Sequence, residues 1–318
     1  MKRGNNILIT GAAGFIGSHL SDVIYNKGEF SKLVLLDNLF LGKPSNLNQI
    51  QESRKVIKLL GKEFSCTKFN TMKEIIVENK IDTVIDLATI PLPVSLEDPR
   101  WCFEEITSMG SVICELLRQG HYGKLYHIST SEVYGSAEYT PMDELHPWQS
   151  RTSYAASKGA VDLMIKSYVA TFNCNAVILR PFNNYGPRQN DGNYAGVIPI
   201  FIRNYLTKTK STIFGDGQQT RDFIYVTDTA KIIDKLLDTE ISKGEIINIA
   251  SGNEISVKQI FKSIYKDFSV EPVFQAERIG DVKQHFACTK KLFNYIKKFD
   301  FTTFDEGIIR TIDWYDSK

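Results

Sequence analysis

The chain has 318 residues, 42% hydrophobic and 24% charged, a balance typical of folded globular proteins. Its formal net charge of +1 gives no global field that would favour nucleic acid or an anionic membrane as a partner. No stretch approaches the roughly 18 uninterrupted apolar residues of a membrane span, and the N-terminus carries no apolar signal segment. Five scattered cysteines without CxxC or Cys/His clustering predict free thiols, no metal site and a cytoplasmic location.

Short apolar runs alternate with helical patterns through the first half of the chain. Strands are predicted at residues 6–10, 32–37, 82–88, 124–129 and 175–181. A helix is predicted at 16–25. Continuously apolar strands separated by helices favour an α/β fold with a doubly wound parallel sheet covered on both faces.

The pattern changes after Pro181. A loop rich in Asn and Gly spans 183–196, and a turn followed by a strand is predicted at 213–226. Residues 245–251 read as one more strand of the sheet. We therefore expect a second, smaller unit that is interleaved with the first.

A phosphate-binding turn is predicted between the first strand and the first helix. Gly11, Gly14 and Gly17 form a G-x-x-G-x-x-G variant that lets the backbone approach a pyrophosphate at a helix N-terminus. Asp37 ends the second strand, where a carboxylate can bind a ribose 2′-hydroxyl and repel a 2′-phosphate. The pair favours NAD, although Lys43 leaves NADP open. The alternative is a plain turn and a solvated aspartate.

A second candidate site lies on the helical pattern around residue 160. Tyr154 and Lys158 are four residues apart and share a helix face, where the ammonium would lower the pKa of the phenol. Thr130, at a strand end shortly before, offers a second hydroxyl to the same substrate oxygen. Two hydroxyls beside a hydride acceptor form an alcohol-oxidising site. Taken alone, the Tyr/Lys spacing also fits an ordinary surface pair.

Seven motifs follow one another along the chain: TGAAGFIG, LLDN, STSEVYG, YAASK, RPFNNYGPRQ, FGDGQQTRDFIYV and ERIGDV. In this order they resemble the extended short-chain dehydrogenases/reductases, nearest to the nucleotide-sugar epimerases, dehydratases and decarboxylases. The resemblance implies a Rossmann-type domain that binds NAD, formed by 1–182 with about 226–250. It also implies a smaller, interleaved α/β domain that binds a nucleoside diphosphate sugar, formed by 183–225 and 251–318.

The resemblance also implies site residues. Thr130, Tyr154 and Lys158 take the family's catalytic positions. The expected cofactor contacts are Gly11, Gly14, Phe15, Ile16, Gly17, Asp37, Asn38, Leu87, Ala88, Tyr154 and Lys158. The expected substrate contacts are Asn183, Arg188, Arg221 and Arg278. The guanidiniums of Arg221 and Arg278 suit a diphosphate, because charge-assisted contacts of this kind are strong and often bidentate.

Ser131 and Glu132 are also predicted to be catalytic residues, and they bear on which reaction follows. In the family, the sugar is oxidised at C4 and the resulting ketone acidifies C5. Glu132 favours a dehydratase, in which this carboxylate acts in elimination across C5 and C6. UDP-glucuronate decarboxylation and 4-epimerisation are the alternatives, and a non-catalytic dinucleotide-binding sensor is a remote one. A loop-capping Glu132 that points to solvent is also open.

Three departures from the family pattern affect details of NAD binding. DLAT at 86–89 replaces the common HLAA, Thr107 stands where Asn is common, and Lys62 stands where Asp often contacts adenine. The helices near Pro99–Gln119 and Ser153–Phe172 resemble the family's four-helix dimer interface. A homodimer is therefore expected.

Overall fold

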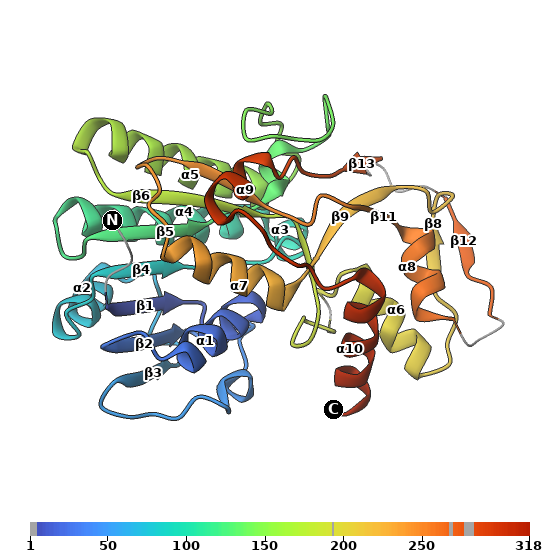
Figure 1. Ribbon diagram of the computed structural model, residues 1–318, viewed down its shortest axis with the longest axis horizontal. Helices are drawn as coiled ribbons and strands as arrows, with labels where there is room; N and C mark the ends of the chain where they lie inside the picture. Colours follow the sequence, from blue (N-terminus) through green and yellow to red (C-terminus); the bar gives the residue numbers. More distant parts are fainter. Residues whose placement is uncertain (1–4, 193, 267–269, 277–282) are drawn as a thin grey trace.

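The computed structural model describes residues 5–192, 194–266, 270–276 and 283–318. Two unequal units lie side by side (Figure 1). The larger is built on a seven-stranded sheet flanked by helices, and the smaller contains α6, α8 and α10 with short strands. The mixed α/β architecture confirms the predicted fold class.

The large sheet is entirely parallel and has the order β10-β6-β5-β4-β1-β2-β3. Its strands are β1 (Asn6–Thr10), β2 (Lys32–Asp37), β3 (Val56–Leu60), β4 (Thr83–Asp86), β5 (Lys124–Ile128), β6 (Ala176–Pro181) and β10 (Ile246–Ile249). Six of them coincide with strands predicted from the sequence. The seventh, β3, was not predicted, because Lys58 interrupts its short apolar run and the strand is only half-buried at the sheet edge.

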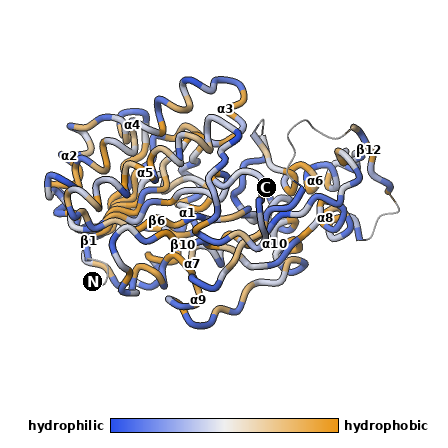
Figure 2. Tube along the Cα trace, turned by 90° about the horizontal axis from the view of Figure 1, so that it is seen from above, coloured by the Kyte–Doolittle hydropathy of each residue, from blue (hydrophilic) through white to orange (hydrophobic). Residues whose placement is uncertain are grey.

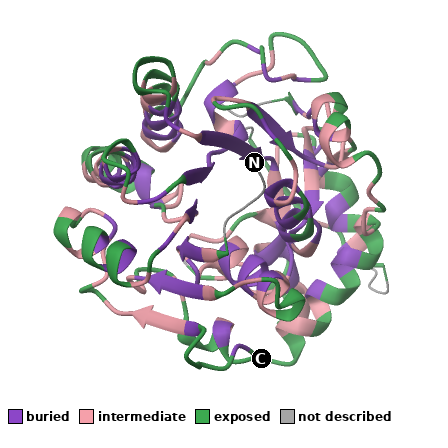
Figure 3. Ribbon diagram, turned by 60° about the vertical axis from the view of Figure 1, so that its left-hand side comes forward, coloured by how far each residue is buried: buried purple, intermediate pink, exposed green. Residues whose placement is uncertain are grey.

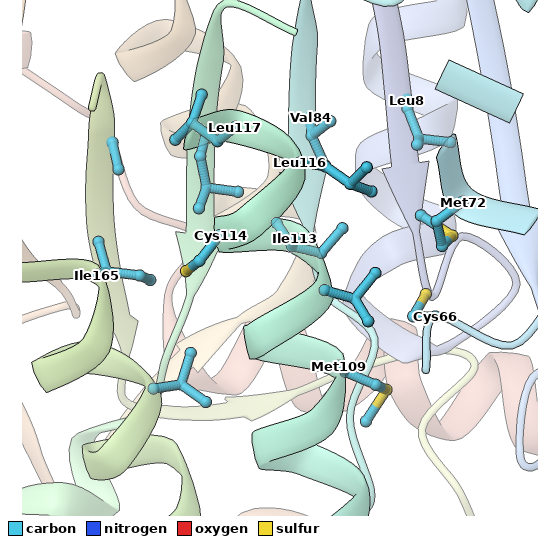
Figure 4. Close-up of a cluster of buried hydrophobic side chains, with 14 of the residues drawn as sticks. Leu8, Cys66, Met72, Val84, Met109, Ile113, Cys114, Leu116, Leu117 and Ile165 are labelled. Carbon is cyan, nitrogen blue, oxygen red and sulfur yellow. The ribbon is translucent and has the colours of Figure 1, made fainter. Parts of the chain in front are cut away.

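Helices cover both faces of this sheet. One layer contains α2 (Phe69–Glu78), α4 (Pro99–Arg118) and α5 (Ser153–Phe172), and the other contains α1 (Phe15–Lys27), α7 (Val226–Leu237) and α9 (Lys290–Ile296). Successive residues of β1 point to opposite faces, so Leu8 packs in the first layer and Ile7 in the second. Figure 4 shows the first layer, where Leu8 and Val84 of the sheet lie near Met72 and Ile113.

Both faces of the sheet are therefore shielded from solvent. The strands form the hydrophobic centre of the larger unit (Figure 2) and are mostly buried (Figure 3). Burial on two sides explains why the strands are continuously apolar rather than alternating.

The smaller unit has its own core. Strands β7 (Asn183–Tyr185), β9 (Thr220–Tyr225), β11 (Glu254–Ser256) and β13 (Gln284–His285) form one sheet, and β8 (Thr212–Phe214) pairs with β12 (Val273–Gln275). Helices α6 (Val197–Leu206), α8 (Val257–Ile264) and α10 (Phe304–Asp316) enclose an apolar cluster around Phe201 and Phe261. The short helix α3 (Val94–Glu97) and the 3-10 turns η1 (Pro44–Leu47) and η2 (Ser131–Tyr134) complete the described elements.

The chain passes between the units more than once. Helix α7 returns to the larger unit after β9, and α9 packs against α7 and β10 although it follows β13 in sequence. The division into domains at 182, 225 and 250 stays a prediction. No helix within the described ranges is both long and apolar enough to cross a membrane.

A close helix contact generates the first testable prediction. A Cβ at Gly110 of α4 would lie 2.6 Å from Cγ2 of Val161 on α5. We expect Gly110→Ala to lower the free energy of unfolding by about 1–3 kcal/mol, because the added methyl overpacks the crossing. Denaturant titration measures this change.

Two variants control this prediction. Ser111 is exposed on the same helix, so Ser111→Ala should change stability little. Adding Val161→Ala to Gly110→Ala makes room for the methyl and should recover part of the loss. Equal stabilities for Gly110→Ala and Ser111→Ala would contradict the steric argument.

Candidate active site

A cavity of about 840 Å³ opens where the carboxyl ends of β1, β2, β4 and β5 face α6, β8 and β9 of the smaller unit. Every described residue that the sequence analysis assigned to a site lines this cavity: Gly11, Gly14, Phe15, Ile16, Gly17, Asp37, Asn38, Leu87, Ala88, Thr130, Ser131, Glu132, Tyr154, Lys158, Asn183, Arg188 and Arg221. Arg278 lies outside the described residues. Parallel strands bring these distant segments together because their carboxyl ends share one edge.

The glycine turn forms a close backbone cradle. A Cβ at Gly17 would lie 2.1 Å from the carbonyl oxygen of Gly11, so a side chain there would force the turn open. Gly11 has φ +65, a conformation that L side chains rarely adopt. Gly14 caps α1 without a side-chain hydrogen bond. Phe15, Ile16 and Gly17 of the first turn line the cavity, so this helix N-terminus fits the pyrophosphate of a dinucleotide.

Asp37 is fixed at the end of β2. Its carboxylate accepts hydrogen bonds from the backbone N–H of Ala13 at 2.9 Å and of Leu39 at 2.8 Å. Burial raises the pKa of Asp37, and these N–H donors oppose the rise. A Cβ at Gly42 would lie 2.6 Å from Asp37 Oδ1, so glycine lets the following loop close over the carboxylate. The residues at this end fit the adenosine ribose of NAD.

Tyr154 and Lys158 enter the cavity from the first turns of α5, whose cap is Thr152 accepting from the N–H of Ala155. Burial raises the pKa of Tyr154 well above its ordinary value, and its hydrogen bond with Thr130 opposes the rise. Lys158 is 1% exposed. Its Nζ donates to the carbonyl oxygen of Ile128 at 2.6 Å, and burial lowers its pKa.

Thr130 and Glu132 lie on the exit from β5. Thr130 caps η2, its Oγ1 accepting from the N–H of Glu132 at 3.2 Å. Burial raises the pKa of the Glu132 carboxyl, and the charge of Arg221 opposes the rise. The Glu132 charge also acts on Tyr154. Two hydroxyls and a partly desolvated carboxylate therefore face one cavity.

The predicted substrate residues lie on the other side of the cavity. Asn183 Nδ2 donates to the carbonyl oxygen of Asp222 at 3.2 Å, and Arg221 Nη1 donates to that of Thr220 at 2.9 Å. Arg188 forms an ion pair with Asp22 on α1 at 2.7 Å. Arg188 is thereby held next to the helix that carries the glycine turn.

The sequence analysis missed several aromatic residues that line the cavity: Phe40, Phe64, Tyr194, Phe223 and Trp314. They come from separate loops and from β9 and α10, and no local motif marks them. Glu105 and Met109 of α4 also line the cavity and were missed. No group of three or more metal-ligating side chains occurs among the residues that the structure describes.

A doubly wound sheet with a glycine turn, an acidic strand end and a buried Tyr–Lys pair defines a dinucleotide-dependent enzyme of the extended short-chain dehydrogenase/reductase type. The model of the NAD-dependent epimerase/dehydratase family matches residues 7–250, so the chain belongs to this family. Its cofactor is NAD.

Relatives in this family differ in reaction. The chain is 34% identical to a putative UDP-glucose 4-epimerase of Methanocaldococcus jannaschii over 97% of both chains. It is 35% identical to a UDP-N-acetyl-alpha-D-glucosaminuronate decarboxylase of Bacillus cytotoxicus over 81% of this chain and 79% of that protein. A dTDP-glucose 4,6-dehydratase of Bacillus anthracis, solved with NAD, superposes with TM-score 0.87 at 26% identity, over 98% of this chain and 96% of that one.

The geometry around Asp37 predicts the cofactor preference. We expect Asp37→Asn to weaken NAD binding by roughly tenfold and to reduce the discrimination against NADP, because the neutral amide no longer repels a 2′-phosphate. Calorimetric titration with each dinucleotide measures both affinities. The exposed Asp300→Asn is the control. An unchanged ratio of NAD to NADP affinity would rule out this role for Asp37.

Proposed function

We propose that this protein is an NAD-dependent nucleotide-sugar dehydratase that acts through a 4-keto sugar. The observation that carries the proposal is the Glu132 carboxylate, which lines the same cavity as Thr130 and Tyr154 and has a raised pKa. A simple 4-epimerase needs the two hydroxyls and no additional base. Elimination across C5 and C6 needs such a base.

In the first step, Tyr154 takes the proton of the sugar 4-hydroxyl while Thr130 holds the same oxygen. Burial raises the pKa of Tyr154, so proton removal needs added positive charge nearby. Lys158 supplies part of it from the next turn of α5. When bound, NAD supplies a positively charged ring that accepts a hydride from the sugar and later returns it.

In the second step, Glu132 acts on the ketone. The C4 carbonyl acidifies the C5 hydrogen, and a carboxylate with a raised pKa is a stronger base for it. The C5–H electron pair forms the C5–C6 double bond as the C6 hydroxyl leaves. The departing C6 hydroxyl needs a proton, and the Ser131 hydroxyl is too weak an acid to supply it. Glu132 itself therefore passes the C5 proton to this hydroxyl, which leaves as water. The proton lost from O4 balances the one that C5 regains when the double bond is reduced.

The substrate is proposed to be a nucleoside diphosphate sugar. Arg221 lines the cavity from β9 of the smaller unit, and its guanidinium suits a diphosphate. Arg188 lines the cavity next to α1 and keeps its proposed contact with the substrate. Asn183 would contact the sugar or the diphosphate. Arg278 keeps its proposed role as a second diphosphate clamp, although it lies outside the described residues.

The second candidate function is 4-epimerisation, which the full-length similarity to the Methanocaldococcus protein favours. Decarboxylation of a nucleotide-linked uronic acid is a third, favoured by the similarity to the Bacillus cytotoxicus enzyme. All three begin with oxidation at C4. They differ in product mass, because dehydration removes water, decarboxylation removes carbon dioxide and epimerisation leaves the mass unchanged.

Replacing Glu132 separates these reactions. Product mass spectrometry on a panel of nucleotide sugars should show loss of water with the native protein. Glu132→Gln should reduce this product by about a hundredfold or more, because the amide cannot accept the C5 proton. Absorbance at 340 nm should still show transient reduction of bound NAD, because the first step does not use Glu132.

Two variants bracket this experiment. Glu104→Gln, on an exposed part of α4, should keep full turnover. Tyr154→Phe should abolish both the product and the transient reduction. Full activity of Glu132→Gln would refute elimination by this carboxylate, and full activity of Tyr154→Phe would refute the site altogether.

We also propose a homodimer formed by α4 and α5. The two helices pack side by side on one face of the large sheet (Figure 1). Large apolar side chains remain exposed on them, with Phe103 40% and Leu163 58% accessible. Pairing with the same helices of a second copy would cover these groups in a two-fold four-helix bundle.

Sedimentation tests this assembly. The native protein should sediment as a dimer, and Leu163→Glu should shift it toward the monomer, because pairing would bury two uncompensated carboxylates. Leu145→Glu, at a leucine that is 87% exposed and lies outside both helices, should leave the dimer intact. A native monomer at micromolar concentration would contradict the proposal.

A further inference from the structure

Asp86 and His127 form a buried pair beneath the cavity. They are direct neighbours in the parallel register of β4 and β5, and each is 2% exposed. His127 Nδ1 lies 2.8 Å from Asp86 Oδ2. Asp86 is one of the two residues, with Thr89, at which the DLAT segment departs from the family pattern.

The surroundings fix the orientation of both side chains. The Thr10 hydroxyl donates to Asp86 Oδ1 at 2.7 Å. Thr10 Oγ1 in turn accepts from the backbone N–H of Leu87 and Ala88, which line the cavity. Burial raises the pKa of Asp86, but the His127 hydrogen bond and the Lys158 charge outweigh it, and the net pKa is lowered. An ionised Asp86 accepts the His127 Nδ1 proton, so the neutral imidazole presents the Nε2 lone pair elsewhere.

That lone pair faces Lys158. His127 Nε2 lies 3.5 Å from Lys158 Nζ, and the carbonyl oxygen of Ile128 accepts a second Nζ proton at 2.6 Å. With two of its three N–H bonds directed inward, the ammonium is left to point its third into the cavity that Lys158 lines.

The charge balance also assigns Asp86 to Lys158. Asp162 is the other buried carboxylate nearby, but it already accepts two hydrogen bonds from Arg180 and one from Ser129. Asp162 and Arg180 are both fully buried, so their charges largely compensate each other. Asp86 contributes the larger favourable charge to Lys158, and Asp162, whose Oδ1 lies 3.8 Å from His127 Nε2, contributes a smaller one.

We propose that Asp86 and His127 are positioning residues that aim the Lys158 ammonium into the cavity and keep it charged. Asp86 supplies the counter-charge, and His127 transmits it through a ring whose tautomer Asp86 selects. The inference rests on the proposed role of Lys158 beside Tyr154 and deepens it.

Two thiols and one phenol near this cluster keep their protons near neutral pH, whereas Asp162 is charged. Burial raises the pKa of the Cys66 and Cys114 thiols, and the charge of Asp86 raises it further. Burial likewise raises the pKa of the Tyr122 phenol. On the cavity side, Glu132 acts on Tyr154 from η2. The proton changes that matter between neutral and alkaline pH are therefore those of Lys158 and Tyr154.

Removing the Asp86 charge should lower the pKa of Lys158. A nearby negative charge favours the charged form of a lysine, so removing it in Asp86→Asn lowers the pKa of Lys158. The ammonium is then lost at lower pH, and the alkaline limb of the pH–rate profile moves down by about one pH unit. Asn is close in shape to Asp, so packing changes little, but its Nδ2 donates where a carboxylate oxygen accepts. The variant therefore removes both the charge of Asp86 and its selection of the His127 tautomer.

A matched set of variants tests the proposal. Asp86→Asn should shift the alkaline limb by about one unit and His127→Phe by at least as much, whereas His127→Gln, which can still donate to Asp86 and accept from Lys158, should shift it less. His121→Gln, at a histidine whose ring contacts the side chain of Gln119 at 3.1 Å, should leave the alkaline limb unmoved. Thermal unfolding of each variant shows whether it remains folded.

An activity-independent measurement accompanies the profile. NMR titration of the lysine Cε signals, with Lys158 assigned through Lys158→Met, should place the midpoint of Lys158 lower in Asp86→Asn than in the native holoprotein. Equal midpoints and an unmoved alkaline limb in folded Asp86→Asn would overturn the inference. If Tyr154→Phe retains turnover, the proposed function fails, yet the Lys158 midpoint still decides the role of Asp86.

Discussion

The site depends on the Asp162 carboxylate, which ties three elements together inside the larger unit. Asp162 lies on α5, and its Oδ2 accepts from Ser129 at the end of β5 and from Arg180 on β6, both at 2.8 Å. The Arg180 guanidinium is sandwiched near the rings of Tyr134 and Trp148, at 4.8 and 4.4 Å from their centroids. Removing one partner of such a pair typically costs about 3–5 kcal/mol. The pair therefore sets where α5 can lie against the sheet.

Because α5 carries Tyr154 and Lys158, this buried pair also sets the position of the reacting groups. Lys158 is one turn before Asp162, and Ser129 immediately precedes Thr130. The same hydrogen bonds that hold the helix to the strand therefore hold the Thr130 hydroxyl opposite the Tyr154 phenol. Thr130 follows directly on β5 and Tyr154 lies on α5, so regular elements hold both hydroxyls. Under the proposed function, this arrangement brings them to one substrate oxygen.

The elements that sequence patterns predicted well are those whose signal is local. Six strands of the large sheet are continuously apolar because both faces are covered, and Gly11 to Gly17 are marked by spacing alone. The edge strand β3 was not predicted, because it is only partly buried and therefore need not be continuously apolar. The ion pair of Arg188 with Asp22 has no local signal, since the two residues meet only through the fold.

The Asp86–His127 pair is a second contact that local sequence patterns could not predict. The sequence marked Asp86 as unusual but gave no partner for it, because His127 becomes its neighbour only through the β4–β5 register. A lone buried aspartate would be unfavourable, and a lone histidine in an apolar strand reads as a core residue. The fold brings Asp86 and His127 together beside Lys158, and only there do the three side chains interact electrostatically.

Electrostatic coupling also links substrate binding to the proposed elimination. In the free protein, burial raises the pKa of Glu132 while the Arg221 charge opposes the rise. A diphosphate held by Arg221 would neutralise much of that opposing charge, so burial would then dominate. Under the proposed function, Glu132 therefore becomes a stronger base when a nucleotide sugar occupies the cavity. The carboxylate would gain its basicity in the complex, where a C5 proton is present to be removed.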